Sequence, residues 1–319
     1  MTTAVAAFCR AHGVPDGHQA TAIRAGRNSE VHRLTAPDGR VWILKRYFQH
    51  AQDPRDRLGT EYGFLSFCAE HELATVPRPL GCDREHKLAL YSCLPGTRPL
   101  QAEDSHIEQA AAFIRSLLPL RAAAQALPLA ADACLSVDAH LQLAQSRIAR
   151  LLAAPPASTL HAAAQDFVRR ELAPAEAAAR AAVAASSAEL PQTQQLLSPS
   201  DFGLHNSLAH AGRLGFVDFE YAGWDDPAKL ICDFQCQPEI PVSAAQGRRF
   251  GELVLAGWAE EASARVAALL PLHRIKWCCI LLNEFRQADH ARRLHAGLDG
   301  TALLETQLDK ARRYFHAHF

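Results

Sequence analysis

Three polar residues in neighbouring segments have types that suit phosphoryl transfer. The segment "SPSDFGLHNSL" holds Asp201 and Asn206, and "GFVDFEYAGWDDP" holds Asp218. Phosphoryl transfer requires a carboxylate that orients the attacking hydroxyl and oxygen ligands that hold magnesium on the phosphates. A loop with the pattern Asp-x4-Asn, followed by an aspartate at the end of a short hairpin, can supply both. The pattern alone is weak, because solvated turns are rich in Asp and Asn, so the upstream residues must decide.

A lysine and a glutamate upstream form a second candidate pair. Lys45 lies within "VWILKRYF" (41–48), and period-two alternation places it on the same strand face as Val41 and Ile43. A lysine on an apolar face is costly unless its charge is paired. Glu61 lies sixteen residues later on a segment of helical spacing and can pair with it, which would hold the ammonium for ATP phosphates. The alternative is an edge-strand lysine and a glutamate that both face water.

Two further segments are candidates for nucleotide contacts. Gly26 and Ser29 lie in "IRAGRNSEVHRL" (23–34), where a strand–turn–strand can bring backbone N–H groups close to phosphates; an ordinary hairpin is the alternative. The chain contains neither a GxxxxGK[ST] nor a GxGxxG motif. The adenine edge is expected at the backbone of Ser92, Cys93 and Leu94.

The elements that must position these residues change in character along the chain. The first hundred residues alternate strand patterns, including 41–48 and 87–94, with a helical segment over 56–73. Pro95-Gly96 is a strong breaker, and we place a lobe boundary there. The remainder is predominantly helical, apart from a hairpin that turns at Ala211-Gly212. We therefore predict an α+β bilobal fold with a small β-rich N-lobe (1–94) and a larger helical C-lobe (95–319).

Composition limits the possible partners. The 319 residues include 49% hydrophobic and 21% charged residues, with 33 Lys plus Arg against 34 Asp plus Glu. No net field attracts nucleic acid or an anionic membrane, and no apolar run approaches the ~20 residues that span a bilayer. The start of the chain lacks the pattern of a secretory signal, so a cytoplasmic protein is expected. Nine scattered cysteines without CxxC spacing indicate buried thiols rather than a metal site.

Together these residues, in this order, resemble the aminoglycoside phosphotransferase and choline kinase family, which has the bilobal fold of protein kinases. In that family "HGDxxxxN" is the catalytic loop and "hDFE" carries the metal-binding aspartate. The resemblance implies that Asp201 is the catalytic base, that Asn206 and Asp218 bind Mg²⁺, and that Lys45 contacts the phosphates of ATP. The Asp-Phe-Gly at 201–203 then only coincides in letters with a kinase DFG. The features that carry the resemblance are the glycine-bearing loop at 25–30, Lys45, Glu61, the hinge "YSCLPG", "SDFGLHN" and "VDFEYAGWDDP".

The chain departs from the family pattern at three positions. The histidine two residues before the catalytic aspartate is Pro199, the following glycine is Ser200, and an aspartate after the "DP" pair is Lys229. Lys229 can pair with a nearby aspartate or lie at the surface. His205 and Trp224 either touch a ligand or are structural. These changes weaken any transfer of substrate identity.

We therefore predict an ATP- and Mg²⁺-dependent kinase that phosphorylates a hydroxyl group of a small molecule, with no nucleic-acid or membrane partner. Sugars, amino alcohols and aminoglycosides all remain possible acceptors. A polycationic acceptor needs clustered carboxylates, and those available are Asp225, Asp226, Glu260, Glu261 and Glu284.

The alternative to a small-molecule kinase is a catalytically silent kinase-like nucleotide-binding module. A protein kinase is disfavoured by the missing APE-type segment and the long helical insert.

Overall fold

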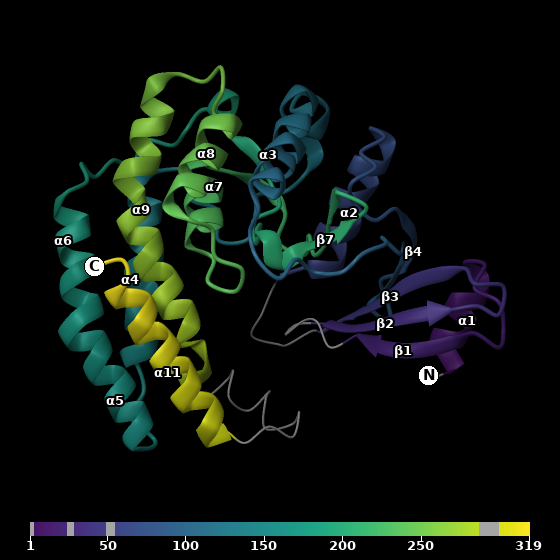
Figure 1. Cartoon of the computed structure of the whole chain (residues 1–319), viewed down its shortest axis with the longest axis horizontal. Coiled ribbons are helices and arrows are strands. Elements are labelled where there is room, and N and C mark those ends of the chain that lie inside the picture. The colour runs from purple at the N-terminus through teal and green to yellow at the C-terminus, as the bar shows by residue number, and fades with distance from the viewer. Residues whose placement is uncertain (1–2, 24–28, 49–54, 287–299) are drawn as a thin grey trace. The chain divides into compact units, whose positions relative to one another are not determined.

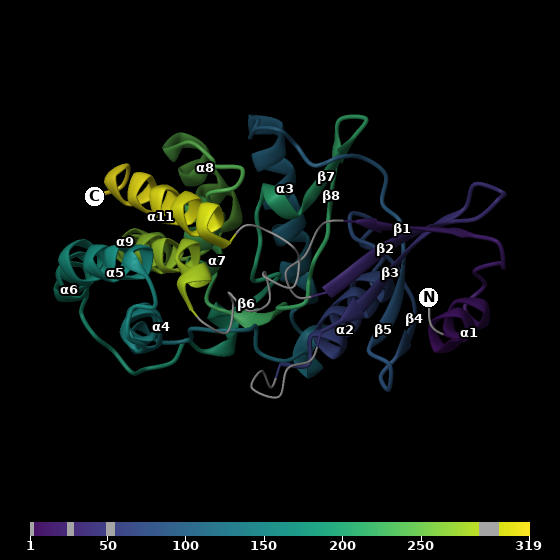
Figure 2. The same cartoon turned by 90° about the horizontal axis from the view of Figure 1, so that it is seen from below.

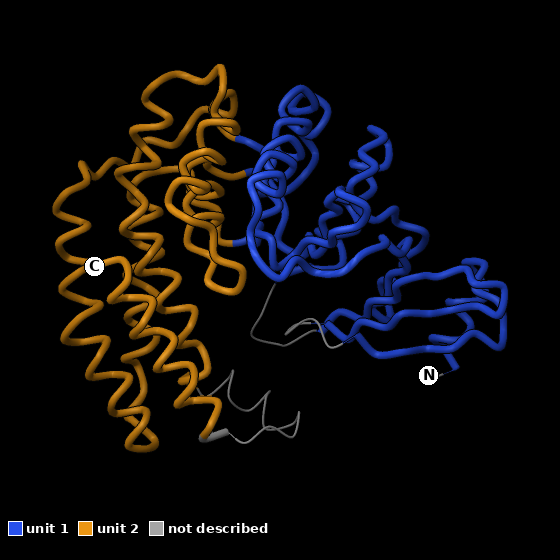
Figure 3. The backbone as a smooth tube through the Cα atoms, viewed as in Figure 1, with its two compact units in different colours: residues 1–131, 196–224 blue, residues 132–195, 225–319 orange. Residues whose placement is uncertain are grey.

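The computed structural model describes residues 3–23, 29–48, 55–286 and 300–319. The chain divides into two compact units, which Figure 3 shows in different colours. Unit 1 comprises Met1–Ala131 and Leu196–Trp224, and unit 2 comprises Asp132–Gln195 and Asp225–Phe319. The lobe boundary predicted after Leu94 lies inside unit 1, and the division at that point stays a prediction.

Unit 1 contains a five-stranded antiparallel sheet in the order β1-β2-β3-β5-β4 (Figure 1). The hairpin between β2 and β3 turns at Gly39, which has a φ of 86° that favours glycine, and the Arg40 N–H donates to Asp38 Oδ1 over 3.0 Å. The strand predicted at 41–48 is thus confirmed as β3. The strands are β1 (Gln19–Ile23), β2 (Ser29–Thr35), β3 (Val41–Tyr47), β4 (Pro79–Asp83) and β5 (Leu88–Ser92).

The sheet buries one apolar face against a helix. Helix α1 (Thr3–Ala11) places Phe8 and Cys9 in one core cluster with Leu34, Trp42 and Leu44 from the strands. Because side chains alternate along β3, Lys45 and Tyr47 point to the opposite face. Helix α2 (Arg57–Glu70) contacts the residues on that face; it begins at Asp56, whose carboxylate accepts the Gly59 N–H over 3.0 Å.

An aromatic cluster joins the rest of unit 1. Phe113 of α3 (Asp104–Leu117) stacks on Phe216 with ring centroids 4.9 Å apart, and it also contacts Phe202 at 5.9 Å and Phe219 at 6.1 Å. Phe64 of α2 stacks on Phe219 at 4.9 Å. The cluster therefore ties two helices to the two chain segments that carry Asp201 and Asp218. The short strands of this region are β6 (Leu196–Ser198), β7 (Ser207–His210), β8 (Arg213–Phe216) and β9 (Gly223–Asp225).

Apart from Asp225, the last residue of β9, the regular secondary structure described in unit 2 is helical (Figure 2). Helix α9 packs against α4, α6, α7 and α11, so it is the central helix of the unit. Cys278 and Cys279 of α9 are buried in the core of the unit, as predicted. The helices are α4 (Val137–Leu152), α5 (Thr159–Phe167), α6 (Ala173–Ala181), α7 (Pro227–Cys236), α8 (Ala244–Val254), α9 (Glu260–Leu281) and α11 (Gly300–His316).

The predicted α+β class is confirmed: the N-terminal region forms an antiparallel sheet and the C-terminal region is helical. The hairpin predicted at Ala211-Gly212 is present as β7 and β8. Among the described residues, no helix is both long and apolar enough to cross a membrane.

Phe113 should be a main determinant of the stability of unit 1. We expect Phe113→Ala to lower the free energy of unfolding by about 3–5 kcal/mol, the usual cost of removing a buried aromatic ring. Leu100 is 100% exposed, and Leu100→Ala serves as the control that should leave stability unchanged. Urea denaturation followed by circular dichroism measures both. A Phe113→Ala loss below about 1 kcal/mol would show that the cluster does not depend on this ring.

Candidate active site

Lys45 is the cation at the centre of the site. Its side chain is buried with the residue 8% exposed, and its Nζ donates to Glu61 Oε2 over 2.7 Å and to Asp218 Oδ1 over 2.8 Å. Burial alone lowers the pKa of the Lys45 amine, but the charges of Asp218, Glu61 and Glu220 outweigh it and hold that pKa well above its usual value. Lys45 is therefore a permanent cation, and the predicted pairing with Glu61 is present.

Glu61 is held by more than Lys45. The Tyr47 hydroxyl donates to Glu61 Oε2 over 2.6 Å, and the Phe219 N–H donates to Oε1 over 3.2 Å. The Tyr91 hydroxyl lies 2.8 Å from that of Tyr47. Burial and the negative charge of Glu61 raise the pKa of both phenols well above the ordinary range, so both remain neutral donors. Glu61 thus links β3, α2 and the segment after β8.

Asp218 stands in a backbone conformation that L-residues rarely adopt. Its φ is 70°, in the left-handed region. The preceding Val217 N–H donates to the backbone oxygen of Asn206 over 2.9 Å, and the following Phe219 is held by Glu61 and by the aromatic cluster. Such strain persists where the surroundings over-determine it and is concentrated at functional sites. The conformation presents the carboxylate to Lys45 while 34% of the side chain stays exposed.

Asp201 and Asn206 lie on one short loop. The Asn206 amide nitrogen donates to the backbone oxygen of Asp201 over 2.9 Å, and the Asp201 N–H donates to the oxygen of Pro199 over 3.1 Å. His205, on the 3₁₀ turn Leu204–Asn206, places its Nε2 3.3 Å from Asp201 Oδ1. The Asp201 side chain is 39% exposed and can be reached by a ligand. The structure therefore brings Asp201 and Asn206 together, and Val217 connects their loop to Asp218.

The serine that replaces the family glycine also has a strained backbone. Ser200 has a φ of 68°, which explains physically why glycine suits this position. Its N–H donates to Ser198 Oγ over 3.0 Å, and its hydroxyl lies 3.4 Å from the oxygen of Ala131. These contacts hold the loop in a conformation that serine does not favour by itself.

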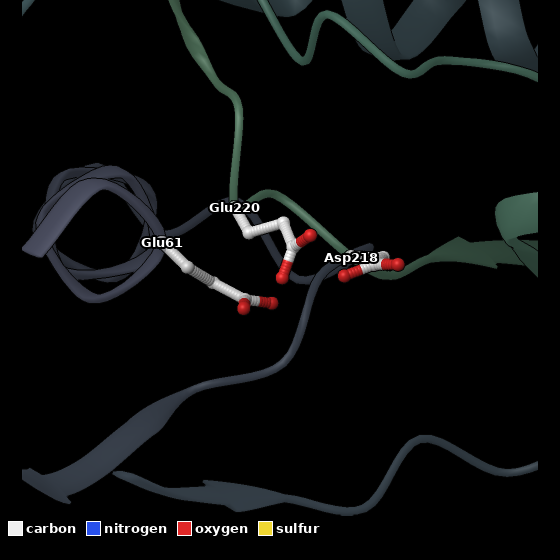
Figure 4. A group of neighbouring side chains, drawn as sticks. All are labelled: Glu61, Asp218 and Glu220. Atoms are coloured by element: carbon white, nitrogen blue, oxygen red, sulfur yellow. The ribbon is translucent and has the colours of Figure 1, made fainter. Parts of the chain in front are cut away.

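Three carboxylates meet at this site in Figure 4: Glu61 from α2, and Asp218 and Glu220 from the segment after β8. Their nearest oxygens all lie within 4.8 Å of one another. The ammonium of Lys45 contacts Glu61 and Asp218, so the lysine accounts for the close approach of these carboxylates. Glu220 also accepts the Ser29 hydroxyl over 3.2 Å and lies 3.6 Å from Arg57 Nε. Glu220 thereby fixes the start of β2.

Asn206 and Asp218 fit the magnesium role that the sequence predicts for them. Magnesium takes oxygen ligands, usually one or two from the protein together with phosphate oxygens. The nitrogen of the Asn206 amide is occupied by Asp201, which leaves the amide oxygen as the ligand atom. The Asp218 carboxylate is partly exposed. The donor set therefore suits a hard divalent cation, and the metal-binding roles stay predictions.

The remaining predicted nucleotide residues are placed as follows. Gly26 lies outside the described residues. Ser92 is the last residue of β5. Its N–H donates to the backbone oxygen of Arg78 over 2.9 Å, and its hydroxyl accepts the Arg78 N–H over 2.8 Å. Cys93 accepts a bond from Arg33 over 3.6 Å, and its thiol lies 3.5 Å from the oxygen of Leu94. Their contact with adenine stays a prediction.

Lys229 is not a surface lysine. It is 2% exposed, and its Nζ donates to Asp225 Oδ2 over 2.7 Å and lies 3.8 Å from Asp233 Oδ2. Burial lowers the pKa of this amine, but the charges of Asp225 and Asp233 raise that pKa by more than burial lowers it, so the net shift is upward. Asp226 is also buried and bonds to His140 and Arg265 over 3.0 Å and 2.6 Å. The replacement at 229 is thus satisfied by an internal ion pair of unit 2.

Sequence reasoning missed Tyr47, Tyr91 and the role of Glu220. A tyrosine two residues after Lys45 lies on the same strand face, which was the available signal for Tyr47. Tyr91 and Glu220 gave no such signal, because their contacts depend on strand pairing and on the backbone turn at Asp218. Trp224 is buried and its indole donates to the oxygen of Ala124 over 3.1 Å, so it is structural.

The phosphotransferase enzyme family matches residues 19–275 of the chain, which is most of its length and includes every site residue described above. The chain belongs to this family. It is therefore an enzyme that transfers phosphate to small molecules, and the resemblance seen in the sequence is confirmed. No curated protein matches the chain.

Several solved structures share the fold along nearly the whole chain. A spectinomycin phosphotransferase in complex with ADP and spectinomycin has a TM-score of 0.68 at 10% identity, with 98% of each chain covered. A choline/ethanolamine kinase family protein from Mesorhizobium loti has a TM-score of 0.59 at 16% identity, with 98% of this chain and 95% of that chain covered. An amicoumacin kinase with AMP-PNP and Ca²⁺ has a TM-score of 0.53 at 15% identity, with 94% and 92% covered. The protein-kinase-like fold is thus confirmed.

The Lys45–Glu61 pair should show strong energetic coupling in this phosphotransferase. Removal of one partner leaves the other charge buried. Lys45→Met and Glu61→Gln should therefore each lower the free energy of unfolding, and the double mutant should lose less than the sum of the two single losses. We expect a coupling energy of about 1–3 kcal/mol from the double-mutant cycle, measured by urea denaturation.

The matched control is the pair of Glu30 and Arg46, which face each other across β2 and β3 with their charged atoms 3.8 Å apart. Both side chains are more than half exposed, so the same cycle on Glu30→Gln and Arg46→Met should give a coupling near zero. Equal coupling in the two cycles would contradict a special role of the buried pair.

Ser200 offers a separate test of backbone strain in the loop. We expect Ser200→Gly to fold with a melting temperature no lower than that of the wild type, because glycine adopts a φ of 68° without steric cost. Ser200→Val should be destabilised by about 1–3 kcal/mol, since a β-branched residue is an outlier there. Differential scanning calorimetry distinguishes the two. A stabilising Ser200→Val would refute the left-handed conformation.

Proposed function

We propose that this phosphotransferase transfers the γ-phosphate of MgATP to a hydroxyl group of a small molecule. The observation that carries the proposal is the arrangement around Lys45: its ammonium is fixed between Glu61 and Asp218, and the Asp218 segment is bonded to the loop of Asp201 and Asn206. Phosphoryl transfer depends on positioning and charge stabilisation rather than on covalent chemistry by the protein, and this arrangement supplies both.

Each side chain has one role in this proposal. Lys45 neutralises charge on the phosphates and is oriented for this by Glu61. Asn206 and Asp218 hold magnesium, which when bound neutralises phosphate charge and orients the transferred group. Asp201 accepts the hydrogen bond of the acceptor hydroxyl and then its proton. The ligands of the solved relatives support the nucleotide: one is described with ADP and another with AMP-PNP and Ca²⁺.

The acceptor is proposed only as a small hydroxylated molecule such as a sugar, an amino alcohol or an aminoglycoside-like compound. Two of the five carboxylates that the sequence offered to a polycation are already engaged inside unit 2, because Asp225 pairs with Lys229 and Asp226 with Arg265. A strongly cationic acceptor would therefore have to find its counter-charges elsewhere. This reduces the support for an aminoglycoside. The support for a neutral hydroxylated acceptor does not change.

Asparagine substitutions separate the base from the metal ligand. Asp201→Asn removes the charge that accepts the proton, and we expect turnover to fall about 10²–10⁴-fold while MgATP still raises the melting temperature. Asp218→Asn removes an anionic magnesium ligand, so the MgATP-induced shift should weaken and recover in part at high magnesium. Thermal shift with and without EDTA, and ADP release with a panel of amino alcohols, sugars and aminoglycosides, measure both effects.

Three outcomes would decide against the proposal. Folded wild-type protein without any thermal shift at millimolar MgATP would overturn nucleotide binding. A shift without ADP release on any acceptor would favour the silent nucleotide-binding module. If Asp201→Asn lost the MgATP shift while Asp218→Asn kept it, the two roles would be exchanged, and Asp201-Phe202-Gly203 would be the metal-binding segment.

A further inference from the structure

His205 makes one polar contact within the described residues, and that contact is with Asp201. The residue is 8% exposed, and its Nε2 lies 3.3 Å from Asp201 Oδ1. The other ring nitrogen, Nδ1, is buried, and no residue in the described part of the chain forms a hydrogen bond with it. The ring therefore has one polar neighbour among the described side chains, the Asp201 carboxylate at Nε2.

The chemistry of this contact fixes the proton on Nε2. A carboxylate is only an acceptor of hydrogen bonds, so the facing Nε2 must be the donor. Nδ1 then has no partner, and burying a polar atom without one costs roughly 1–3 kcal/mol. An apolar side chain of similar size would be the more stable choice for packing alone. A histidine at this position is thus better explained by its contact with Asp201 than by stability.

Two residues of the loop contact Asp201, one at its backbone and one at its side chain. The Asn206 amide fixes the backbone oxygen of Asp201, whereas His205 is the one described side chain that contacts the Asp201 carboxylate. A carboxylate that is 39% exposed and otherwise unsupported can rotate about its χ angles. Neighbouring residues of one 3₁₀ turn therefore control the main chain and the side chain of the same aspartate.

We propose that His205 is a positioning residue for the phosphotransfer reaction. Its Nε2–H holds Oδ1 of Asp201, so that Oδ2 is directed to the acceptor hydroxyl. The acceptor proton passes to Oδ2 as the acceptor oxygen forms its bond to the phosphorus and the bond to the ADP oxygen breaks; His205 neither gains nor loses a proton. This inference rests on the proposed function, because it takes Asp201 as the base.

Three substitutions at one position separate the hydrogen bond from packing. His205→Gln can place an amide N–H near the position of Nε2, whereas His205→Leu fills the space without a donor and His205→Ala removes both. Because misplacement of a reacting group can cost up to about 10²-fold in rate, we expect kcat to fall about 10–100-fold in His205→Leu and His205→Ala. The KM for MgATP and the MgATP-induced thermal shift should not change.

His205→Gln should recover kcat to within about threefold of the wild type, a loss of under 1 kcal/mol in barrier. His205→Leu should be at least as stable as the wild type, because it removes the unpartnered Nδ1. In an Asp201→Asn background, His205→Leu should have no further effect on kcat, since the two residues act as one unit. His210 is exposed on the neighbouring strand β7, and His210→Leu is the control that should leave kcat unchanged.

The outcomes distinguish this inference from the function on which it rests. If the wild type and His205→Leu transfer phosphate with equal kcat, the positioning role is wrong and the proposed function stands. An equal loss in His205→Gln and His205→Leu would also contradict it. If folded wild-type protein binds MgATP but transfers no phosphate to any acceptor, both proposals fall. Should His205→Leu not fold, His205→Ala and His205→Gln make the same comparison.

Discussion

The arrangement of unit 1 depends on one buried ammonium group. Lys45 lies on a strand face where its charge must be compensated, and the compensating carboxylates come from α2 and from the segment after β8. A sheet, a helix and a loop distant in sequence must therefore meet at one atom. Apolar replacements of buried ion pairs are often as stable as the pair itself. The cost of burying this network is thus better explained by a need to hold a cation at a fixed point than by stability.

The aromatic cluster gives this electrostatic centre a rigid support. Asp201 and Asp218 are each followed directly by a phenylalanine, and both rings, Phe202 and Phe219, pack against Phe113. Each ring anchors the backbone beside its aspartate, while the carboxylate stays partly exposed. The repeated Asp-Phe pair therefore has a physical meaning: the apolar residue fixes the position of the chain, and the polar residue is then available to a ligand.

The sequence predicted those parts of the site that depend on local pattern. Alternation placed Lys45 on a strand, helical spacing placed Glu61 on the next helix, and the spacing of Asp201, Asn206 and Asp218 indicated their order. It could not show the positive φ of Ser200 and Asp218, because only a few per cent of non-glycine residues adopt that conformation and neither residue type predicts it. It also could not show that Glu61 accepts bonds from Tyr47 and Phe219, since strand register and a loop conformation together create that contact. Contacts between residues distant in the sequence could therefore not be predicted.

The departures at Ser200 and Lys229 show how the chain tolerates changes next to its functional residues. At Ser200 the backbone keeps a conformation suited to glycine, and hydrogen bonds to neighbouring segments hold it there. At Lys229 a positive charge has two aspartates close by, so the buried group remains paired. In both cases a local cost is met by contacts within the same unit. The ion pairs of Lys229 are with Asp225 and Asp233, and the side chain of Ser200 contacts Ala131, so in the described contacts neither replacement adds a charge beside Asp201, Asn206 or Asp218.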